Sequence, residues 1–186
     1  MKELPHFAIT GKKRAGKDVV VAYLVQKHGY TRVALADGIR KLDSELSGEA
    51  AGSIKNNWRL QELGRVMREL YGRDFWIRQT IQNMREKLQE NPEITFAVSD
   101  MRFPLEAETY REEGFVLIRI NASEDTRIRR MKALGEEVNE KILNHETEMH
   151  VDSLKVDYEI DNNGSEEALF AQIDRMVQAI LNKRTG

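Results

Sequence analysis

Short apolar runs alternate along this chain with longer segments in which apolar residues recur every three or four positions. The apolar runs predict buried strands at about residues 7–10, 31–36, 94–98, 115–120 and 156–160. The longer segments have the period of an α-helix with one apolar face. Strands that alternate with helices predict an α/β fold of three layers, α/β/α, in which a mainly parallel five-stranded sheet has helices on both sides.

Several of the predicted helices have recognisable ends. The first ends at Gly29, after Lys27 and His28 in its last turn. Ser123 and Ser165 are expected to cap two later helices, because a serine hydroxyl can accept a hydrogen bond from a free backbone N–H group of the first turn. The polar segment 135–151 is expected to be irregular. The expected helices are 19–28, one that opens at Asp37-Gly38, 58–71, 75 to about 89, 105–113, and the two that follow Ser123 and Ser165.

The connection between the first strand and the first helix carries the most specific motif of the chain. It reads Gly11-Lys12-Lys13-Arg14-Ala15-Gly16-Lys17-Asp18, which matches the phosphate-binding pattern G-x-x-x-x-G-K, with Asp where that pattern has Ser or Thr. The glycines let successive backbone N–H groups point at one anion, and the helix N-terminus adds partial positive charge. Lys17 would reach the β- and γ-phosphates. The motif predicts an ATP site contacted by Gly11, Lys13, Arg14, Ala15, Gly16, Lys17, Asp18 and Val19.

Two carboxylates are candidate ligands for Mg²⁺. Asp18 directly follows Lys17, and a carboxylate beside a triphosphate is repelled unless a cation lies between them. Asp100 follows the apolar run 94–98, and ligands of open parallel sheets bind at the carboxyl ends of strands. We therefore expect Asp18 and Asp100 to serve the metal, and Asp100 is also a candidate for contact with the acceptor. The alternatives are a first-turn helix acid for Asp18 and a loop cap for Asp100.

Arg102 is a candidate catalytic residue together with Lys17 and Asp100. It lies two residues after Asp100, at the same predicted end of the sheet, and a guanidinium group can hold two phosphate oxygens at once. The alternative is an ion pair on the protein surface with Glu106, four residues further on.

A lid is predicted at about residues 123–150. Its first helix is rich in arginine, and Arg127, Arg129 and Arg130 could bring positive charge to a transition state; of these, Arg127 and Arg130 are our catalytic candidates. A solvent-exposed charged helix face is the alternative. After the last strand, Asn162-Asn163-Gly164 predicts a tight turn, from which the backbone of Asn163 could contact the adenine ring.

The residues at about 37–90 include candidates for contact with an acceptor. This region holds aromatic side chains that could form a wall for a flat ring, although helix packing is an equally simple role for several of them. It also holds cations for a phosphate group, which could instead belong to exposed charged helix faces. The candidate acceptor-binding residues are Asp37, Arg40, Lys41, Arg65, Arg68, Arg73 and Trp76.

Composition narrows the class of protein. The 186 residues suit one domain, and 29 basic against 31 acidic residues give a net charge of −2, which argues against nucleic-acid binding through a global basic field. The chain has no cysteine, which excludes disulfides and a thiol nucleophile. No stretch has the length and apolarity of a signal peptide or membrane span, so we expect a cytoplasmic protein without a membrane partner. The sequence leaves open whether it forms a homodimer.

Several blocks together resemble the phage-type deoxynucleoside monophosphate kinases, which are P-loop NTPases. The phosphate-binding loop ending in Asp18 is the most specific, and it is also similar to the loop of animal-type phosphomevalonate kinases. Leu60–Gly64 and Asp74–Trp76 look like the nucleotide-kinase branch in particular. The other blocks, which fit both families, are Leu35–Leu42, Val98–Arg102 and Ile160–Leu169.

This resemblance implies a nucleoside-monophosphate-kinase-like fold in one kinase domain over residues 1–186, in which the region at about 37–90 holds the acceptor and the region at about 123–150 forms the lid. It implies ATP and Mg²⁺ as cofactors, contact of Lys17 with the transferred phosphoryl group, metal or acceptor contact by Asp18 and Asp100, and a phosphate grip by Arg102. Ala15 departs from the family, where Ser is frequent, and loses a hydroxyl. We predict an ATP-dependent kinase that phosphorylates a (deoxy)nucleoside monophosphate in nucleotide metabolism. The rivals are a phosphomevalonate kinase and a nucleotide-binding regulator without turnover.

Overall fold

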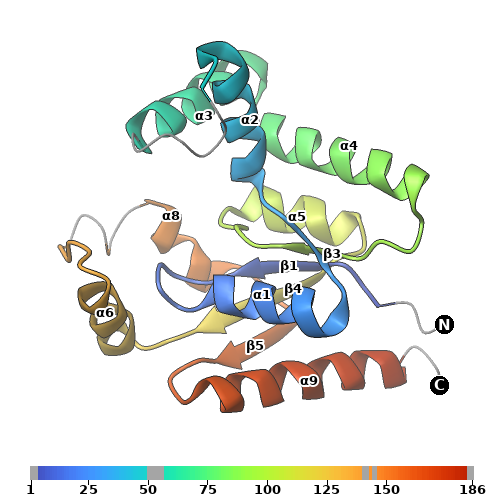
Figure 1. Ribbon diagram of the computed structural model, residues 1–186, viewed down its shortest axis with the longest axis vertical. Helices are drawn as coiled ribbons and strands as arrows, with labels where there is room; N and C mark the ends of the chain where they lie inside the picture. Colours follow the sequence, from blue (N-terminus) through green and yellow to red (C-terminus); the bar gives the residue numbers. More distant parts are fainter. Residues whose placement is uncertain (1–3, 50–56, 140–142, 144–145, 184–186) are drawn as a thin grey trace. The chain divides into compact units, whose positions relative to one another are not determined.

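The centre of the fold is a five-stranded sheet with the strand order β2-β3-β1-β4-β5. It is seen in the computed structural model of the protein, which describes residues 4–49, 57–139, 143 and 146–183 (Figure 1). The strands are β1 (Phe7–Thr10), β2 (Thr31–Val33), β3 (Phe96–Val98), β4 (Val116–Asn121) and β5 (Tyr158–Asp161). The predicted fold class is therefore confirmed.

The middle strand β1 is parallel to both of its neighbours. Phe7 is in register with Ala97 of β3 and with Val116 of β4, and β4 is in turn parallel to β5. All four residues of β1 are buried, because strands cover both of its edges and helices cover both faces of the sheet. The parallel register also places the C-terminal ends of β1 and β3 side by side, and these are the positions from which the predicted site residues emerge.

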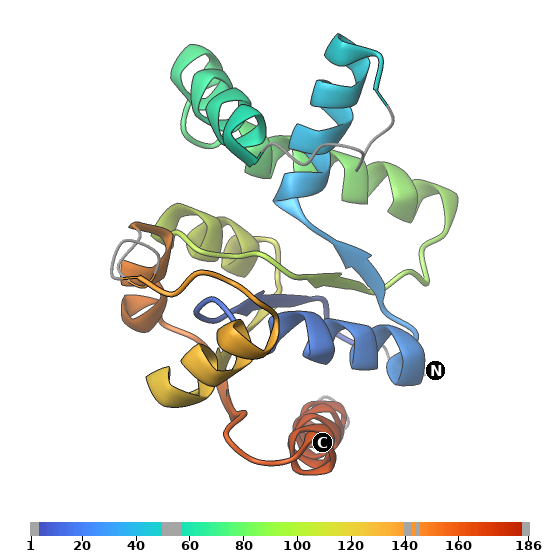
Figure 2. The same cartoon turned by 60° about the vertical axis from the view of Figure 1, so that its left-hand side comes forward.

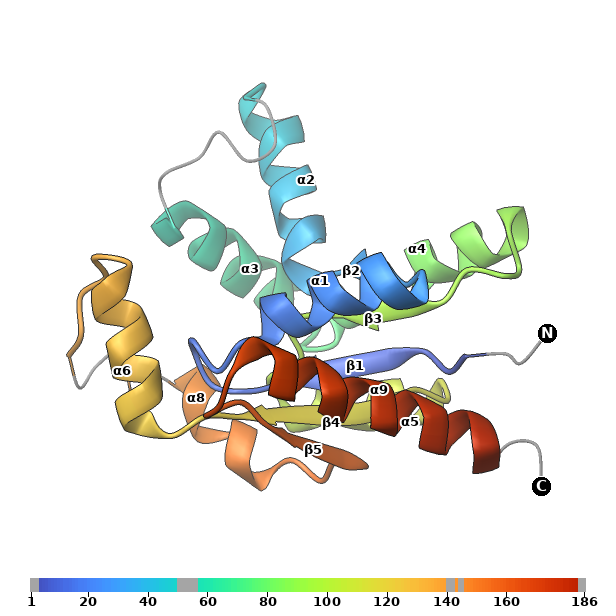
Figure 3. The same cartoon turned by 60° about the horizontal axis from the view of Figure 1, so that its bottom comes forward.

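Helices α1 (Lys17–His28) and α9 (Glu166–Lys183) lie together on one face of this sheet, and α5 (Pro104–Glu112) lies on the opposite face (Figure 3). Between α1, α9 and the sheet lies the main core, in which Leu24 and Ile173 are completely buried. The segment between β4 and β5 forms α6 (Glu124–Ala133), α8 (Glu146–Met149) and the 3₁₀ turn Val151–Ser153.

Two units are distinguished by their internal contacts. The larger unit combines Met1–Arg32 with Thr95–Gly186, and the smaller unit comprises Val33–Ile94. The smaller unit contains the helices α2 (Leu35–Ser47), α3 (Asn57–Tyr71) and α4 (Phe75–Glu90), which pack on one another (Figure 2). The residues 50–56, 140–142 and 144–145 of the predicted acceptor and lid regions lie outside the described part of the chain.

The predicted helices are present, but three details differ. Helix α1 begins at Lys17, two residues before the predicted start. The segment 135–151 was expected to be irregular, yet Glu146–Met149 forms the short helix α8. The third difference is the start of α2. Strand β2 ends at Val33 and α2 begins at Leu35, whereas the sequence predicted a strand to residue 36 and a helix from Asp37. The reason is that the Asp37 carboxylate accepts a hydrogen bond from the backbone N–H of Ala34 at 3.1 Å, so this acid lies in the first turn and fixes an earlier start. The predicted serine caps are confirmed: Ser123 accepts from the N–H of Thr126 and Ser165 from that of Ala168.

The packing of α9 gives a test of the core. Replacing Ile173 by Ala should lower the free energy of unfolding by about 3 kcal/mol, because the transfer energy is lost and a cavity remains next to Leu24. The measurement is denaturant unfolding followed by far-UV circular dichroism. Leu134→Ala is the control, since that side chain is 61% exposed and its loss should change stability by less than about 0.5 kcal/mol. Equal effects of the two substitutions would contradict this account of the core.

Candidate phosphate-binding site

The loop between β1 and α1 has the backbone shape that its glycines predict. Gly11 and Gly16 have φ angles of +154° and +106°, a range that L side chains rarely adopt. A Cβ atom on Gly11 would lie 2.7 Å from the Ile120 carbonyl oxygen, and one on Gly16 would lie 2.1 Å from Asn162 Nδ2. A larger residue at either position would therefore have a strained backbone and would clash with Ile120 of β4 or with Asn162 after β5.

Lys17 is the most enclosed charged group of the loop. Its side chain folds back on the loop, and Nζ donates to the carbonyl oxygens of Gly11 at 2.6 Å and Lys12 at 3.2 Å. Burial, together with the charge of Arg102, lowers the pKa of Lys17 to about 8, while the charges of Glu148, Asp18 and Asp100 oppose this shift. The ammonium group is thus held among one cation and three carboxylates.

Asp18 in α1 and Asp100 after β3 both act electrostatically on Lys17. Asp18 is exposed in the first turn of α1, and Asp100 follows β3 and is half-buried. Two carboxylates at a phosphate-binding loop suit Mg²⁺, which keeps most of its waters and takes one or two protein oxygens. Within the described residues no group of three or more His, Asp or Glu side chains could hold a metal on its own.

Glu148 of α8 lies in this cluster and was not among the predicted residues. One of its carboxylate oxygens accepts from the backbone N–H of Lys13 at 2.5 Å, and the other accepts from Arg102 Nη1 at 2.7 Å. Glu148 is only 4% exposed. Nothing in the sequence distinguished this glutamate from the other acids of a polar segment.

Arg127 of α6 is also directed at this carboxylate. Its Nη1 atom lies 4.0 Å from Glu148 Oε2, and the side chain is 3% exposed. Neither Nη1 nor Nε has a hydrogen-bond partner among the described residues. A buried guanidinium group with unused donors is suited to hold an oxyanion.

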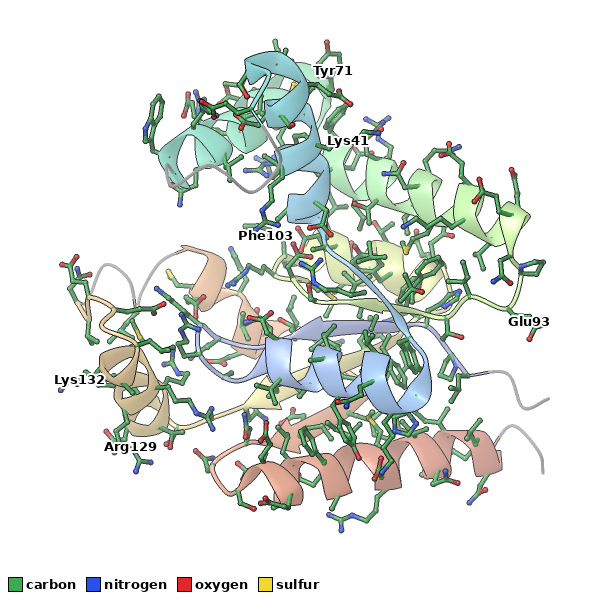
Figure 4. All side chains as sticks on the ribbon, in the orientation of Figure 1. Lys41, Tyr71, Glu93, Phe103, Arg129 and Lys132 are labelled. Carbon is green, nitrogen blue, oxygen red and sulfur yellow. The ribbon has the colours of Figure 1, made fainter. Side chains whose placement is uncertain are left out.

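Arg130 contacts the loop itself rather than the carboxylate. Its guanidinium group donates to the carbonyl oxygens of Arg14 at 3.1 Å, Ala15 at 3.3 Å and Asn162 at 2.9 Å. By contrast, Arg129 is exposed and points outward from α6, away from the loop (Figure 4). Of the three arginines predicted for the lid, the structure therefore brings two to the phosphate-binding loop.

Asn162 is a second site residue that the sequence did not single out. It is 6% exposed, and its Nδ2 donates to the Ala15 carbonyl oxygen at 2.7 Å. The predicted neighbour, Asn163, is exposed, and its side chain bonds Asp161 and the backbone N–H of Ser123. The position of Asn162 directly after β5, at the end of the sheet where ligands bind, was the available signal.

Glu106 holds the loop that carries Arg102. Its carboxylate accepts from the backbone N–H groups of Arg102 at 2.6 Å and Phe103 at 3.0 Å. Burial raises the pKa of Glu106 to about 7, with a smaller contribution in the same direction from Asp100. The ion pair considered between the side chains of Glu106 and Arg102 is therefore replaced by backbone contacts, which leave the guanidinium group for Glu148.

In the smaller unit, most of the candidate acceptor residues are exposed. Arg65 is held by its helix neighbours Glu62 and Glu69, and Arg40 pairs with Asp37 at 3.1 Å. These pairs have the spacing expected of a charged helix face. Arg68 and Arg73 are exposed, as is Lys41, which is marked in Figure 4.

Trp76 lies in the interior of the smaller unit. It is 5% exposed, its Nε1 donates to the Gly64 carbonyl oxygen at 3.1 Å, and its ring lies where a Cβ on Gly38 would come within 3.3 Å. This is the packing role considered for the aromatic residues. Trp58 and Tyr71 are 66% and 58% exposed, so the rings of these two aromatic residues are accessible to a ligand.

No protein-family model matches this chain, and no curated protein matches it. Among solved structures, it is similar to TT1252 from Thermus thermophilus, with a TM-score of 0.59 and 21% identity over 99% of this chain and 100% of the other. It is similar to a shikimate kinase from Acinetobacter baumannii, with a TM-score of 0.52 and 15% identity over 100% and 97%. It is also similar to a gluconokinase from Sinorhizobium meliloti, with a TM-score of 0.52 and 14% identity over 97% of this chain and 98% of the other. At these identities the likeness shows only that the chain shares the α/β fold of these structures.

The contact between Asn162 and Ala15 predicts a role in shaping the loop. Asn162→Ala should weaken the binding of Mg²⁺-ATP by about tenfold, because the loss of one buried hydrogen bond to the loop carbonyl lets the cradle relax. Isothermal titration calorimetry would measure this. Asn163→Ala is the comparison, since a backbone contact from Asn163 survives that change. If Asn163→Ala weakens ATP binding as much as Asn162→Ala does, the loop is not held by Asn162.

Proposed function

We propose that this protein is an ATP-dependent kinase that transfers a phosphoryl group to a small phosphorylated acceptor, a (deoxy)nucleoside monophosphate. The single observation that supports this most strongly is the cluster at the end of β1. There the two carboxylate oxygens of Glu148 are surrounded by positive groups, in the way that phosphoryl oxygens would be. These groups are the side chains of Lys17, Arg102 and Arg127 and the backbone N–H of Lys13.

The chemistry proposed is direct in-line transfer, in which positioning and charge neutralisation do most of the catalysis. The N–H groups of the loop would hold the phosphate chain, and Lys17 would leave the carbonyl oxygens of Gly11 and Lys12 to follow the transferred group. Arg102 and Arg127 would neutralise charge on the transferred phosphoryl oxygens. Arg130 would keep the loop in shape through its bonds to the carbonyl oxygens of Arg14 and Ala15.

Asp18 and Asp100 are the residues that would hold Mg²⁺. When bound, the ion supplies charge neutralisation between the β- and γ-phosphates. The exposed position of Asp18 and the half-buried position of Asp100 leave room for the water ligands that Mg²⁺ keeps. A carboxylate that contacts the acceptor hydroxyl or phosphate through water is the second role open to Asp100.

The acceptor assignment is supported by the sequence more than by geometry. The resemblance of Leu60–Gly64 and Asp74–Trp76 to the nucleotide-kinase branch favours a nucleoside monophosphate, and the exposed rings of Trp58 and Tyr71 could stack on a base. The exposed cations Lys41, Arg68 and Arg73 could hold its phosphate. The same cations could hold mevalonate phosphate, which is the rival within the kinases.

An acceptor panel with ATP and Mg²⁺ tests the proposal. We expect ADP release with at least one nucleoside monophosphate and a higher kcat/KM for it than for mevalonate phosphate, shikimate or gluconate. Lys17→Ala is the matched control and should lower kcat by about a thousandfold, because it removes a charge that acts on the transferred group. A higher kcat/KM for mevalonate phosphate would reassign the acceptor. ATP binding without ADP release for any acceptor would favour a regulator without turnover.

The metal role of Asp18 has its own test. Asp18→Asn keeps the size of the side chain and removes its charge, so the concentration of Mg²⁺ that gives half-maximal activity should rise by about tenfold. A Mg²⁺ titration of both proteins measures this. If Asp18 only favours the start of α1, the titration is unchanged and the substitution costs no more than about 1 kcal/mol of stability.

A further inference from the structure

The segment between α6 and β5 sends three carboxylates to the phosphate-binding loop. Asp152 pairs with the Lys12 ammonium group at 2.5 Å, and Glu136 pairs with the side chains of Lys13 and Arg14. The third carboxylate is that of Glu148. These acids contact three successive basic positions of a loop whose motif is made for an anion.

Glu148 is more buried than the other two acids, and it contacts a backbone group of the loop as well as side chains. The side chains of Asp152 and Glu136 are 67% and 26% exposed, whereas that of Glu148 is 5% exposed. Asp152 and Glu136 meet flexible side chains at the rim, but Glu148 also accepts a hydrogen bond from a backbone N–H group of the loop itself. A buried carboxylate is tolerated only where charges and donors replace its water. Here Arg102, Arg127 and the Lys13 N–H group do so.

The position of this carboxylate corresponds to one end of a bound triphosphate. In loops of this motif the N–H groups near the helix hold the α- and β-phosphates, and the lysine reaches the β- and γ-phosphates. Lys13 is four residues before Lys17 and lies outside α1. The guanidinium groups of Arg102 and Arg127 converge beside its N–H group. This is the surrounding expected for the terminal phosphoryl group.

We propose that the Glu148 carboxylate is an internal ligand of the terminal-phosphoryl position, which ATP must displace and ADP need not. This inference rests on the proposed function, since it assumes that the loop binds a nucleoside triphosphate. Glu148 and a γ-phosphate compete for the same three donor groups, and two anions cannot share them without strong repulsion. Glu148 therefore weakens the binding of ATP relative to ADP.

The decisive variant is Glu148→Gln, which keeps the size of the side chain and removes its charge. The amide is a weaker acceptor from guanidinium groups than a carboxylate, so the position becomes easier to vacate. The dissociation constant for Mg²⁺-ATP should fall by about tenfold or more, and that for Mg²⁺-ADP by less than about threefold. Calorimetric titration without acceptor measures both constants and needs no turnover.

Asp152→Asn is the matched control. It removes one negative charge from the same segment and next to the same loop, but the pair of Asp152 with Lys12 is exposed and screened by solvent. Both dissociation constants should stay within about twofold of the unsubstituted protein. A general effect of net charge would instead tighten ATP binding equally in the two variants, and that result would overturn the proposal.

A second variant and a second probe separate the possible failures. Glu148→Asp keeps the charge but shortens the reach to the Lys13 N–H group, so it should tighten ATP binding by a smaller factor than Glu148→Gln. This variant replaces Glu148→Gln if the latter does not fold.

Tripolyphosphate tests the site without a nucleoside. If ATP does not bind but Glu148→Gln binds tripolyphosphate more tightly than the unsubstituted protein, the ATP assignment is wrong and the inference stands. If neither variant binds any triphosphate more tightly, the inference is wrong.

Discussion

Positive charge gathered at the end of β1 is the constraint on which the rest of the site depends. Lys17 and Arg127 are almost fully buried, and N–H groups of the loop add partial positive charge. Burying such groups without a negative partner is costly, because the protein interior solvates ions poorly. Glu148 supplies the partner, and the depressed pKa of Lys17 shows that the balance is only partial. The counter-charge for these cations is thus carried by α8.

The sheet fixes where that charge gathers. Because β1 lies between β3 and β4, the loop after it is pressed against the Ile120 carbonyl oxygen, and Asn162 reaches it from the end of β5. The loop is therefore shaped by two strands that follow it by more than a hundred residues in sequence. Arg130 adds a third restraint from α6 by bonding the same carbonyl oxygens. The shape of the loop therefore depends on contacts at the C-terminal end of the sheet as well as on the glycines of its own motif.

Local patterns predicted what depends on local physics. The strand, glycine loop and helix at residues 7–28 follow from an apolar run, two glycines in strained positions and Gly29 at the helix end, and the structure has all three. Asp37 misled the prediction of α2, since an acid in the third position of a helix resembles one before its start. Glu148 and Asn162 escaped prediction because their burial depends on chain segments that are distant in sequence. Trp76 was predicted to contact a ligand, and nothing in its local sequence revealed that Gly38 leaves space for its ring and that the Gly64 carbonyl oxygen accepts from its Nε1.

The contacts of Glu148 with Arg102 and Arg127 affect the relative free energies of the protein with and without a bound phosphoryl group. Glu148 orients Arg102 and neutralises part of the charge near Arg127, so it prepares the geometry that a phosphoryl group uses and stabilises the protein without one. In the proposed mechanism the same carboxylate would have to leave this position before a phosphoryl group could bind. Stability of the empty form and affinity for the terminal phosphate therefore oppose each other at one side chain. In the proposed mechanism ADP would leave this position free, so the return of Glu148 would favour the complex with ADP over the complex with ATP. This difference would oppose transfer of the phosphoryl group back to ADP.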